Sequence, residues 1–284
     1  MGRAKSLVVN VIFCFGNAER HLNYVGHLPC MQSNERPAVK SVRTNFEIVH
    51  ALVEMEGARI SNLADRLEMP ISTLHDHLDT LKQLDYVVQR DQHYFPGIRF
   101  LEIGGRARKS YKVYRIGKPV VDQLATKSGD HANLMIEENG IGSLVYKSRG
   151  DNAIQLDTYT GMRMRLHTTA MGKAILAHTP DDRLNSLMEE SPLEAVTDNT
   201  ITDPESLKAE LEDVREKGYA TDVEERIEGV SCVAAPIIDE DGNSIAAISI
   251  SGPSKKIRGN TERQTMIDDV QKGANIIEVN LTFS

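Results

Sequence analysis

Residues 218–253 read GYATDVEERIEGVSCVAAPIIDEDGNSIAAISISGP, and this stretch decides the fold of the C-terminal part of the chain. It holds two runs of small and apolar residues, one around Cys232 and one around Ser249, separated by a polar turn that contains Asp241-Gly242. Runs of this kind on either side of a turn predict an antiparallel pair of strands. Two acidic residues, Asp222 and Glu225, precede the first strand.

One face of the predicted pair is small and weakly polar, because side chains alternate across a strand. This face carries Cys232, Ala234, Pro236, Ala247, Ser249 and Ser251. The opposite face carries the apolar residues Val233, Ala235, Ile237, Ile248 and Ile250. Small side chains leave room above a sheet, and thiol and hydroxyl groups offer hydrogen bonds there. The spacing fits a pocket for a small polar molecule and a packing surface under a helix equally well.

The run from Gly218 through Asp222, Glu225 and Cys232-Val233-Ala234 to Ile237 and Asp239 resembles the signature of the IclR family of transcriptional regulators. Ile238 departs from it, because the family usually has an aromatic residue or His there. The resemblance implies an α+β protein. An N-terminal winged helix-turn-helix is joined by a linker helix to a C-terminal GAF-like, mixed α/β effector-binding domain.

We expect this plan to divide the chain into four parts. Residues 31–98 form the winged helix-turn-helix, 99–128 the linker helix and 129–284 the effector-binding domain. Residues 1–30 continue no domain pattern, whereas Met31 begins a sequence that reads like an ordinary protein start. We therefore expect residues 1–30 to be a disordered or spurious N-terminal extension.

The composition fits a cytoplasmic protein with one or two packed domains. The chain has 284 residues, 40% of them hydrophobic, and no apolar run as long as the ~18 residues of a membrane span. Its three cysteines are widely spaced, which argues against a disulfide framework or a zinc ribbon. The net charge is −8, but the acidity is concentrated after residue 110. A neutral N-terminal part can still present a local basic face to DNA.

Three helices and a hairpin are predicted in the N-terminal part. The helices cover about 41–56, 61–68 and 72–84, with Ser61 as the N-cap of the second. The first has an apolar stripe of Phe46, Ile48, Val49, Leu52 and Val53. Met69-Pro70 forces a turn between the second and third helices, which is a helix-turn-helix arrangement. Residues 86–95 then predict a short β-hairpin in the position of a wing.

The third helix of such a domain enters the major groove, where its first turn reaches base edges. Its segment Ile71–Leu81 also resembles the recognition helix of the IclR family, although Ile71 and Asp76 stand where the family often has basic residues. Singly, each polar residue has an ordinary alternative, since Ser72 can cap the helix and the histidines can be solvated. The predicted DNA contacts are Ile71, Ser72, Thr73, His75, His77, Arg90, Gln92 and His93.

A basic linker and a mixed domain follow. Gly104-Gly105 predicts a hinge within the linker helix, because glycine has low helix propensity. Strands are predicted at 131–137, 141–147, 154–159 and 162–166, with an Asn139-Gly140 hairpin turn. Thr168 or Thr169 can cap a helix that opens at Ala170, and Asp203 can cap another. A final amphipathic helix is predicted at 261–277.

The resemblance assigns the effector pocket to six residues: Ala170, Met171, Asp222, Cys232, Ser249 and Ser251. It implies a regulator, and not an enzyme, whose binding to double-stranded operator DNA responds to a small polar metabolite such as an organic acid or a sugar. It also implies a homodimer or homotetramer that requires no cofactor, metal or membrane. Free N–H groups at the start of the helix at Ala170 would favour an anion.

A rival interpretation centres on Cys232. With His167 as base and Asp222 as orienting acid it could be the nucleophile of a hydrolase-like enzyme, or it could act alone as a thiol sensor. The same three residues could hold a metal. No local motif or spacing favours any of these, and a thiol within an apolar strand is expected to have a raised pKa.

Overall fold

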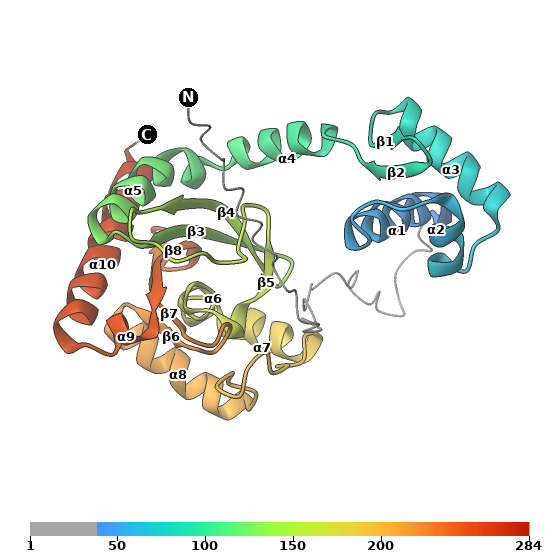
Figure 1. Ribbon diagram of the computed structural model, residues 1–284. Coiled ribbons are helices and arrows are strands. Elements are labelled where there is room, and N and C mark those ends of the chain that lie inside the picture. The colour runs from blue at the N-terminus through green and yellow to red at the C-terminus, as the bar shows by residue number, and fades with distance from the viewer. Residues whose placement is uncertain (1–38, 284) are drawn as a thin grey trace, which may run out of the picture.

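The computed structural model describes residues 39–283, so the expectation for residues 1–30 lies outside the part described. The N-terminal domain is a winged helix-turn-helix, as predicted (Figure 1). It consists of α1 (Lys40–Glu54), α2 (Ile60–Leu67), α3 (Ile71–Gln83), β1 (Val87–Arg90) and β2 (His93–Pro96). The apolar stripes of the helices meet in one core that includes Ile48, Leu52, Leu63, Leu74 and Leu78.

Details of the helix ends differ from the prediction. The predicted cap at Ser61 is wrong, because α2 already begins at Ile60 and Ser61 lies in its first turn. In the same way α3 begins at Ile71, directly after Pro70, so Ser72 is not a cap. The predicted stripe of α1 is only partly buried, since Phe46 is 50% exposed and Val53 is 43% exposed. The stripe is therefore wider than the surface that the domain core covers.

Gly57 fixes the turn between α1 and α2. Its φ of 98° favours glycine, and a Cβ at this position would meet the Phe95 ring at 2.2 Å. The wing packs closely against this turn, where Ala58 and Tyr94 exchange backbone hydrogen bonds of 3.0 and 2.8 Å. The wing is thereby attached to the three-helix core.

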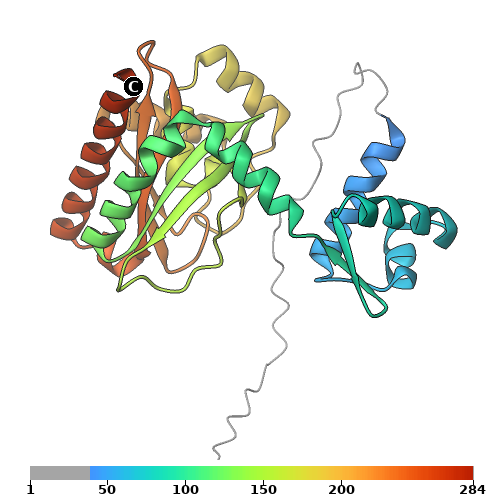
Figure 2. The same ribbon diagram turned by 90° about the horizontal axis from the view of Figure 1, so that it is seen from above.

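The linker is two helices rather than one. They are α4 (Arg99–Ser110) and α5 (Lys112–Ser128), and the break falls at Tyr111, which has an extended backbone. The predicted hinge at Gly104-Gly105 is wrong, because α4 runs straight through both glycines. None of the residues of α4 is buried, whereas α5 buries one side against the sheet. The chain bends between α4, which connects the two domains, and α5, which packs on the sheet (Figure 2).

The C-terminal domain is built on a six-stranded antiparallel sheet with the order β5-β4-β3-β8-β7-β6. The strands are β3 (His131–Glu138), β4 (Ile141–Arg149), β5 (Arg163–Arg165), β6 (Ala220–Val223), β7 (Val230–Ile238) and β8 (Ser244–Pro253). The remaining elements are η1 (Leu166–Thr168), α6 (Ala170–Ala177), α7 (Asp181–Glu190), α8 (Pro204–Lys217), α9 (Ser254–Ile257) and α10 (Asn260–Thr282).

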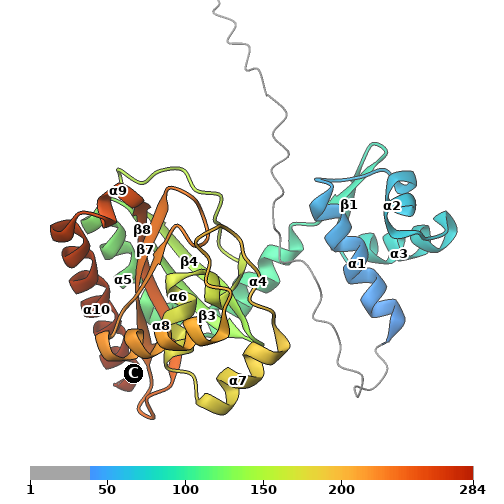
Figure 3. The same cartoon turned by 90° about the horizontal axis from the view of Figure 1, so that it is seen from below.

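Helices cover both faces of this sheet (Figures 1 and 3). On one face α5 and α10 pack against the predicted apolar side of the central strands, including Val233, Ile237 and Ile248. On the other face α6 packs against small residues such as Ala234 and Ala247, and α8 packs against α6. The alternation predicted for β7 and β8 is confirmed.

The predicted strand at 154–159 is wrong, because residues 153–156 have no regular structure. The strand that pairs with β4 at this edge of the sheet is β5. The alternating apolar pattern there instead places Leu156 and Thr158 toward a cavity. The two helix caps predicted in the C-terminal domain are confirmed, and of Thr168 and Thr169 it is Thr169 that caps the first helix. Thr169 accepts a hydrogen bond from Gly172 at the start of α6, and Asp203 accepts one from Ser206 at the start of α8. Helix α7 was not predicted.

Among residues 39–283 we find no helix with the length and apolar character needed to cross a membrane.

Candidate functional sites

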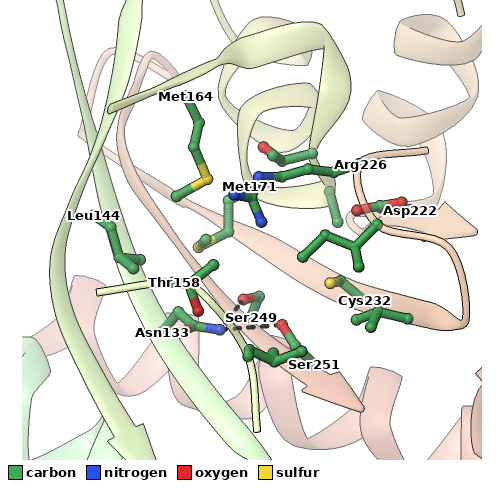
Figure 4. Close-up of a pocket in the computed structure, with 15 residues that line it drawn as sticks. Asn133, Leu144, Thr158, Met164, Met171, Asp222, Arg226, Cys232, Ser249 and Ser251 are labelled. Carbon is green, nitrogen blue, oxygen red and sulfur yellow. Dashed lines mark hydrogen bonds between the residues drawn. The ribbon is translucent and has the colours of Figure 1, made fainter. Parts of the chain in front are cut away.

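A cavity of about 490 Å³, counting its open mouth, lies between the start of α6 and strands β3, β8, β7 and β6 (Figure 4). All six residues predicted for the effector pocket line it: Ala170, Met171, Asp222, Cys232, Ser249 and Ser251. The structure thus favours the pocket over the packing surface for the small, weakly polar face of the sheet. Whether these six residues bind an effector stays a prediction.

Strand register gathers the polar groups of the cavity floor. Asp222 is the partner of Cys232, and Cys232 is the partner of Ser251. On the neighbouring row Ser249 is the partner of Asn133 in β3. The Asn133 Nδ2 group donates to both serine Oγ atoms, at 3.1 Å each. Because each serine oxygen accepts from the amide, the serine hydroxyl hydrogens can be donated to a bound molecule.

The start of α6 supplies backbone donors at the other side of the cavity. Thr169 satisfies two of the first N–H groups, since its Oγ1 accepts from Gly172 at 3.0 Å and its carbonyl from Lys173 at 2.9 Å. The N–H groups of Ala170 and Met171 have no acceptor within residues 39–283. A Cβ at Gly172 would lie 2.0 Å from the Leu166 carbonyl oxygen, so glycine is required for this close approach.

Asp222 is the acidic group of the cavity. Its side chain is almost fully buried, and one carboxylate oxygen accepts a 2.7 Å hydrogen bond from the Glu225 N–H. Burial is the main cause that raises its pKa to about 7, and the charge of Glu225 adds to the effect. Near neutral pH Asp222 can therefore either donate or accept a hydrogen bond.

A buried ion pair holds the loop that follows Asp222. Lys173 of α6 is 1% exposed, and its Nζ lies 2.7 Å from Glu225 and 3.1 Å from Glu210. The Thr200 hydroxyl also donates to the Glu225 carbonyl oxygen, at 2.6 Å. The loop between β6 and β7 is thus fixed to both α6 and the segment before α8.

The geometry gives no support to Cys232 as a nucleophile. Burial, with a smaller contribution from Asp222, raises the pKa of its thiol far above the ordinary value. His167 does not line the cavity; its Nε2 lies 3.1 Å from the Glu194 carbonyl oxygen, and burial lowers its pKa. Within residues 39–283 no three His, Cys, Asp or Glu side chains are grouped so that they could hold a metal ion.

The second candidate site is the surface formed by α3 and the wing. Ile71, Ser72, Thr73 and His75 are exposed along the first turns of α3, as the DNA-contact prediction requires. His77 is different, because it is half-buried and its Nδ1 lies 2.9 Å from Asn45 of α1. On the wing, Arg90 and Gln92 are exposed and His93 is half-buried. The guanidinium of Arg90 lies over the Phe95 ring, 5.4 Å from its centroid.

Several residues of the cavity were missed by the sequence analysis. Asn133 lies in a predicted strand, and its place on the same face as His131 and Met135 was the available signal. Thr158 and Leu156 lie in the segment 154–159, for which the sequence predicts a strand. Arg226 lies in a loop, where no periodicity indicates which way a side chain points. The others are Leu144, Met164, Thr169, Ile227 and Val230.

Comparison with known proteins agrees with this architecture. A family model for the IclR helix-turn-helix domain matches residues 45–91, and the model described as "Bacterial transcriptional regulator IclR C-terminal" matches residues 106–279. Among curated proteins, the "Probable HTH-type transcriptional regulator ArcR" of Halobacterium salinarum is 32% identical over 88% of this chain and 96% of its own length.

Solved structures show the same fold. The crystal structure of Thermotoga maritima IclR has a TM-score of 0.72 and 29% identity, and the match covers 86% of this chain and 99% of that one. An IclR homologue from Microbacterium hydrocarbonoxydans, complexed with 4-hydroxybenzoate, has a TM-score of 0.74 and 21% identity, with 86% of this chain and all of that chain covered (100%). The chain belongs to the IclR family of transcriptional regulators, with an N-terminal DNA-binding domain and a C-terminal effector domain.

Proposed function

We propose that this protein binds a specific DNA operator and that a small organic acid or sugar-like metabolite in the cavity changes its affinity for that operator. The observation that carries the proposal is the cavity itself, which is lined by polar groups at the start of α6 and on β8 and belongs to the same chain as a winged helix-turn-helix. Residues 31–98 would read DNA, residues 129–284 would bind the metabolite, and residues 99–128 would connect them.

The donors of the cavity favour an effector with a carboxylate. The free N–H groups of Ala170 and Met171 and the hydroxyls of Ser249 and Ser251 all offer hydrogens to the same space. Asp222, with its pKa of about 7, would bind a hydroxyl or a second oxygen of the ligand. The 4-hydroxybenzoate in the Microbacterium homologue is likewise a small acid with a hydroxyl group. These contacts are binding contacts, so we propose no catalytic activity.

The DNA contacts would come from the exposed surface of α3 and the wing. Ile71, Ser72, Thr73 and His75 would approach base edges, and Arg90, Gln92 and His93 would contact the backbone or the minor groove. His77 would hold α3 against α1 through Asn45 instead of contacting DNA.

A second copy of the chain would cover the exposed apolar side chains of α1 and α4. The exposed fraction is 66% for Val39, the N-cap of α1, 53% for Val42 and 50% for Phe46, both within α1. Leu101 on α4 is 68% exposed. Two winged domains brought together in this way would bind two half-sites of the operator. We also propose that the protein acts in the cytoplasm. Analytical ultracentrifugation tests this, because Phe46→Asp should shift the protein toward monomer, and an unchanged oligomer would contradict the proposed interface.

The experiment that tests the proposed function is fluorescence anisotropy with the DNA upstream of the protein's own gene. Binding that survives competitor DNA across a salt series is expected, followed by a change in affinity when a small acid is added. Asp222→Ala should retain DNA binding and lose the response to the acid. Absence of specific binding at every salt concentration would overturn the proposal.

A further inference from the structure

Arg226 is a largely enclosed cation that lines the cavity and is not among the six predicted pocket residues. Its side chain is 15% exposed and lines the cavity from the loop between β6 and β7. Figure 4 shows it reaching from the Asp222 side toward Met164 and Met171. An arginine held in this position has had most of its hydration removed, so its partners inside the protein decide what it can bind.

The protein gives this guanidinium very little to bind. Within residues 39–283 the carboxylate found within 4.0 Å is Asp157, at 3.8 Å, which is longer than a hydrogen bond, and the Asp157 side chain is 52% exposed. One Nη2 hydrogen bond goes to the Met162 sulfur at 3.5 Å, and a thioether is a weak acceptor. Most of the five guanidinium donors therefore remain available.

A second cation, Lys147, lies near Arg226. Lys147 is close enough that the charge of Arg226 contributes to lowering its pKa, after burial as the main cause. Lys147 is held beside the cavity by its hydrogen bonds to Thr158, of 2.9 Å to the carbonyl oxygen and 2.6 Å to the hydroxyl. Arg226 and Lys147 thus lie near two acids, the exposed Asp157 and the buried Asp222, and Asp222, with a pKa of about 7, is only partly charged at neutral pH. The remaining positive charge attracts an anion.

The loop that carries Arg226 is fixed in advance. The residue before it, Glu225, is anchored by Lys173 at 2.7 Å and by the Thr200 hydroxyl at 2.6 Å. Two residues of the loop also close a turn, since the Val230 N–H donates to the Ile227 carbonyl oxygen at 3.1 Å. An arginine on such a loop loses little conformational freedom when it binds a ligand.

We infer that Arg226 binds a second carboxylate of the effector, which makes the effector a short-chain dicarboxylic acid; this rests on the proposed function. The first carboxylate would lie on the hydroxyls of Ser249 and Ser251 at the cavity floor. Met171 lies between Arg226 and Ser249 in Figure 4, and Leu144 and Met164 line the same space. An apolar middle with a donor set at each side matches a methylene chain with a carboxylate at each end.

Isothermal titration calorimetry of the full-length chain with length-matched acids tests the inference. The pairs are succinate and butyrate, glutarate and valerate, and adipate and hexanoate. In the wild type at least one dicarboxylate should bind more tightly than its monocarboxylate. Arg226→Gln should weaken that dicarboxylate about 10- to 100-fold, the loss expected for hydrogen bonds to a charged group, and leave the monocarboxylate within about threefold.

Two further variants control for charge and for the site. Arg163→Gln removes an exposed arginine from β5 and should leave both affinities unchanged. Ser249→Ala should weaken both members of a pair. The inference is overturned if dicarboxylates bind no better than monocarboxylates, or if Arg226→Gln binds the dicarboxylate as the wild type does. If monocarboxylates still bind and Ser249→Ala weakens them, the proposed function stands without Arg226; if no acid binds, the carboxylate assignment of the cavity fails as well.

Discussion

The two sites of this protein use polar side chains in opposite ways. On α3 and the wing the candidate contacts are mostly exposed and bonded to little else in the protein, as at Ser72 and Arg90. In the effector domain the candidate contacts are mostly buried, and some are fixed by neighbours, as at Ser249, which is 1% exposed and hydrogen-bonded to Asn133. We therefore expect binding at the first site to depend on charge and ionic strength, and binding at the second to depend on strand register and on burial.

The largest expected effect is on stability, and it compares a buried ion pair of the effector domain with an exposed ion pair of the DNA-binding domain. Lys173→Met leaves Glu225 buried without its cation, so the free energy of unfolding should fall by about 3–5 kcal/mol. The matched control is Arg66→Gln, which breaks a pair with Glu54 whose side chains are 58% and 41% exposed, and should cost less than about 1 kcal/mol. Urea unfolding followed by circular dichroism measures both. Equal losses in the two variants would contradict the contrast.

Asp222 predicts a pH dependence of stability that comes from the buried site. Its pKa is about 7 in the folded protein and 3.8 is its ordinary value, so between these values the folded protein holds a proton that the unfolded chain releases. The contribution of Asp222 to the free energy of unfolding is fully present below pH 3.8. It decreases as the pH rises toward 7 and is lost above that value. Relative to Asp222→Asn, the wild type should lose about 2 kcal/mol of unfolding free energy between pH 5 and 7.

The measurement for Asp222 is a series of urea unfolding curves from pH 5 to 8 for the wild type and Asp222→Asn. The difference between the two should grow up to about pH 7 and then level off. Parallel curves across the whole range would show that Asp222 titrates near its ordinary value.

Arg90 tests the exposed site by its salt dependence. If it neutralises one phosphate, Arg90→Ala should weaken DNA binding and reduce the slope of log K against log salt by about 0.9. Anisotropy titrations at four or more salt concentrations measure the slope. Arg163→Gln in the effector domain should leave it unchanged. An unaltered slope in Arg90→Ala would remove Arg90 from the DNA contacts.

The smallest expected effect concerns Cys232. Because burial keeps its thiol protonated, Cys232→Ser should leave DNA binding unchanged and alter the affinity of a bound acid by no more than about threefold. Wild-type protein should also keep its DNA affinity after treatment with hydrogen peroxide. Loss of the effector response in the serine variant, together with sensitivity of the wild type to peroxide, would revive the thiol-sensor interpretation.

In the effector domain the sequence predicted the faces of the two central strands and two helix caps, whereas the cap predicted at Ser61 in the N-terminal domain is wrong. The faces of β7 and β8, the cap at Thr169 and the cap at Asp203 could all be predicted, because each depends on neighbours in the chain. The six cavity residues followed from the family resemblance. Their meeting in one cavity depends on pairing between strands that are distant in sequence, as between Asn133 and Ser249.

The errors have a common physical origin in tertiary contacts. Gly104 and Gly105 suggested a hinge by their propensity, yet the chain bends at Tyr111, where α5 begins to pack on the sheet. The alternation at 154–159 suggested a strand, but it reflects side chains that face a cavity. Arg226 could not be found at all, because the direction of a loop side chain is set by contacts such as those of Glu225 with Lys173 and Thr200.

The central claim is that occupancy of the buried cavity controls the exposed DNA-binding site. The most direct measurement is the dissociation constant for the DNA upstream of the protein's own gene, by fluorescence anisotropy at fixed salt, with and without the acid that binds most tightly in calorimetry. The account predicts a change of at least about fivefold in the wild type, typical of coupling between sites, and none in Asp222→Ala. An acid that binds the cavity without changing the DNA affinity would contradict it.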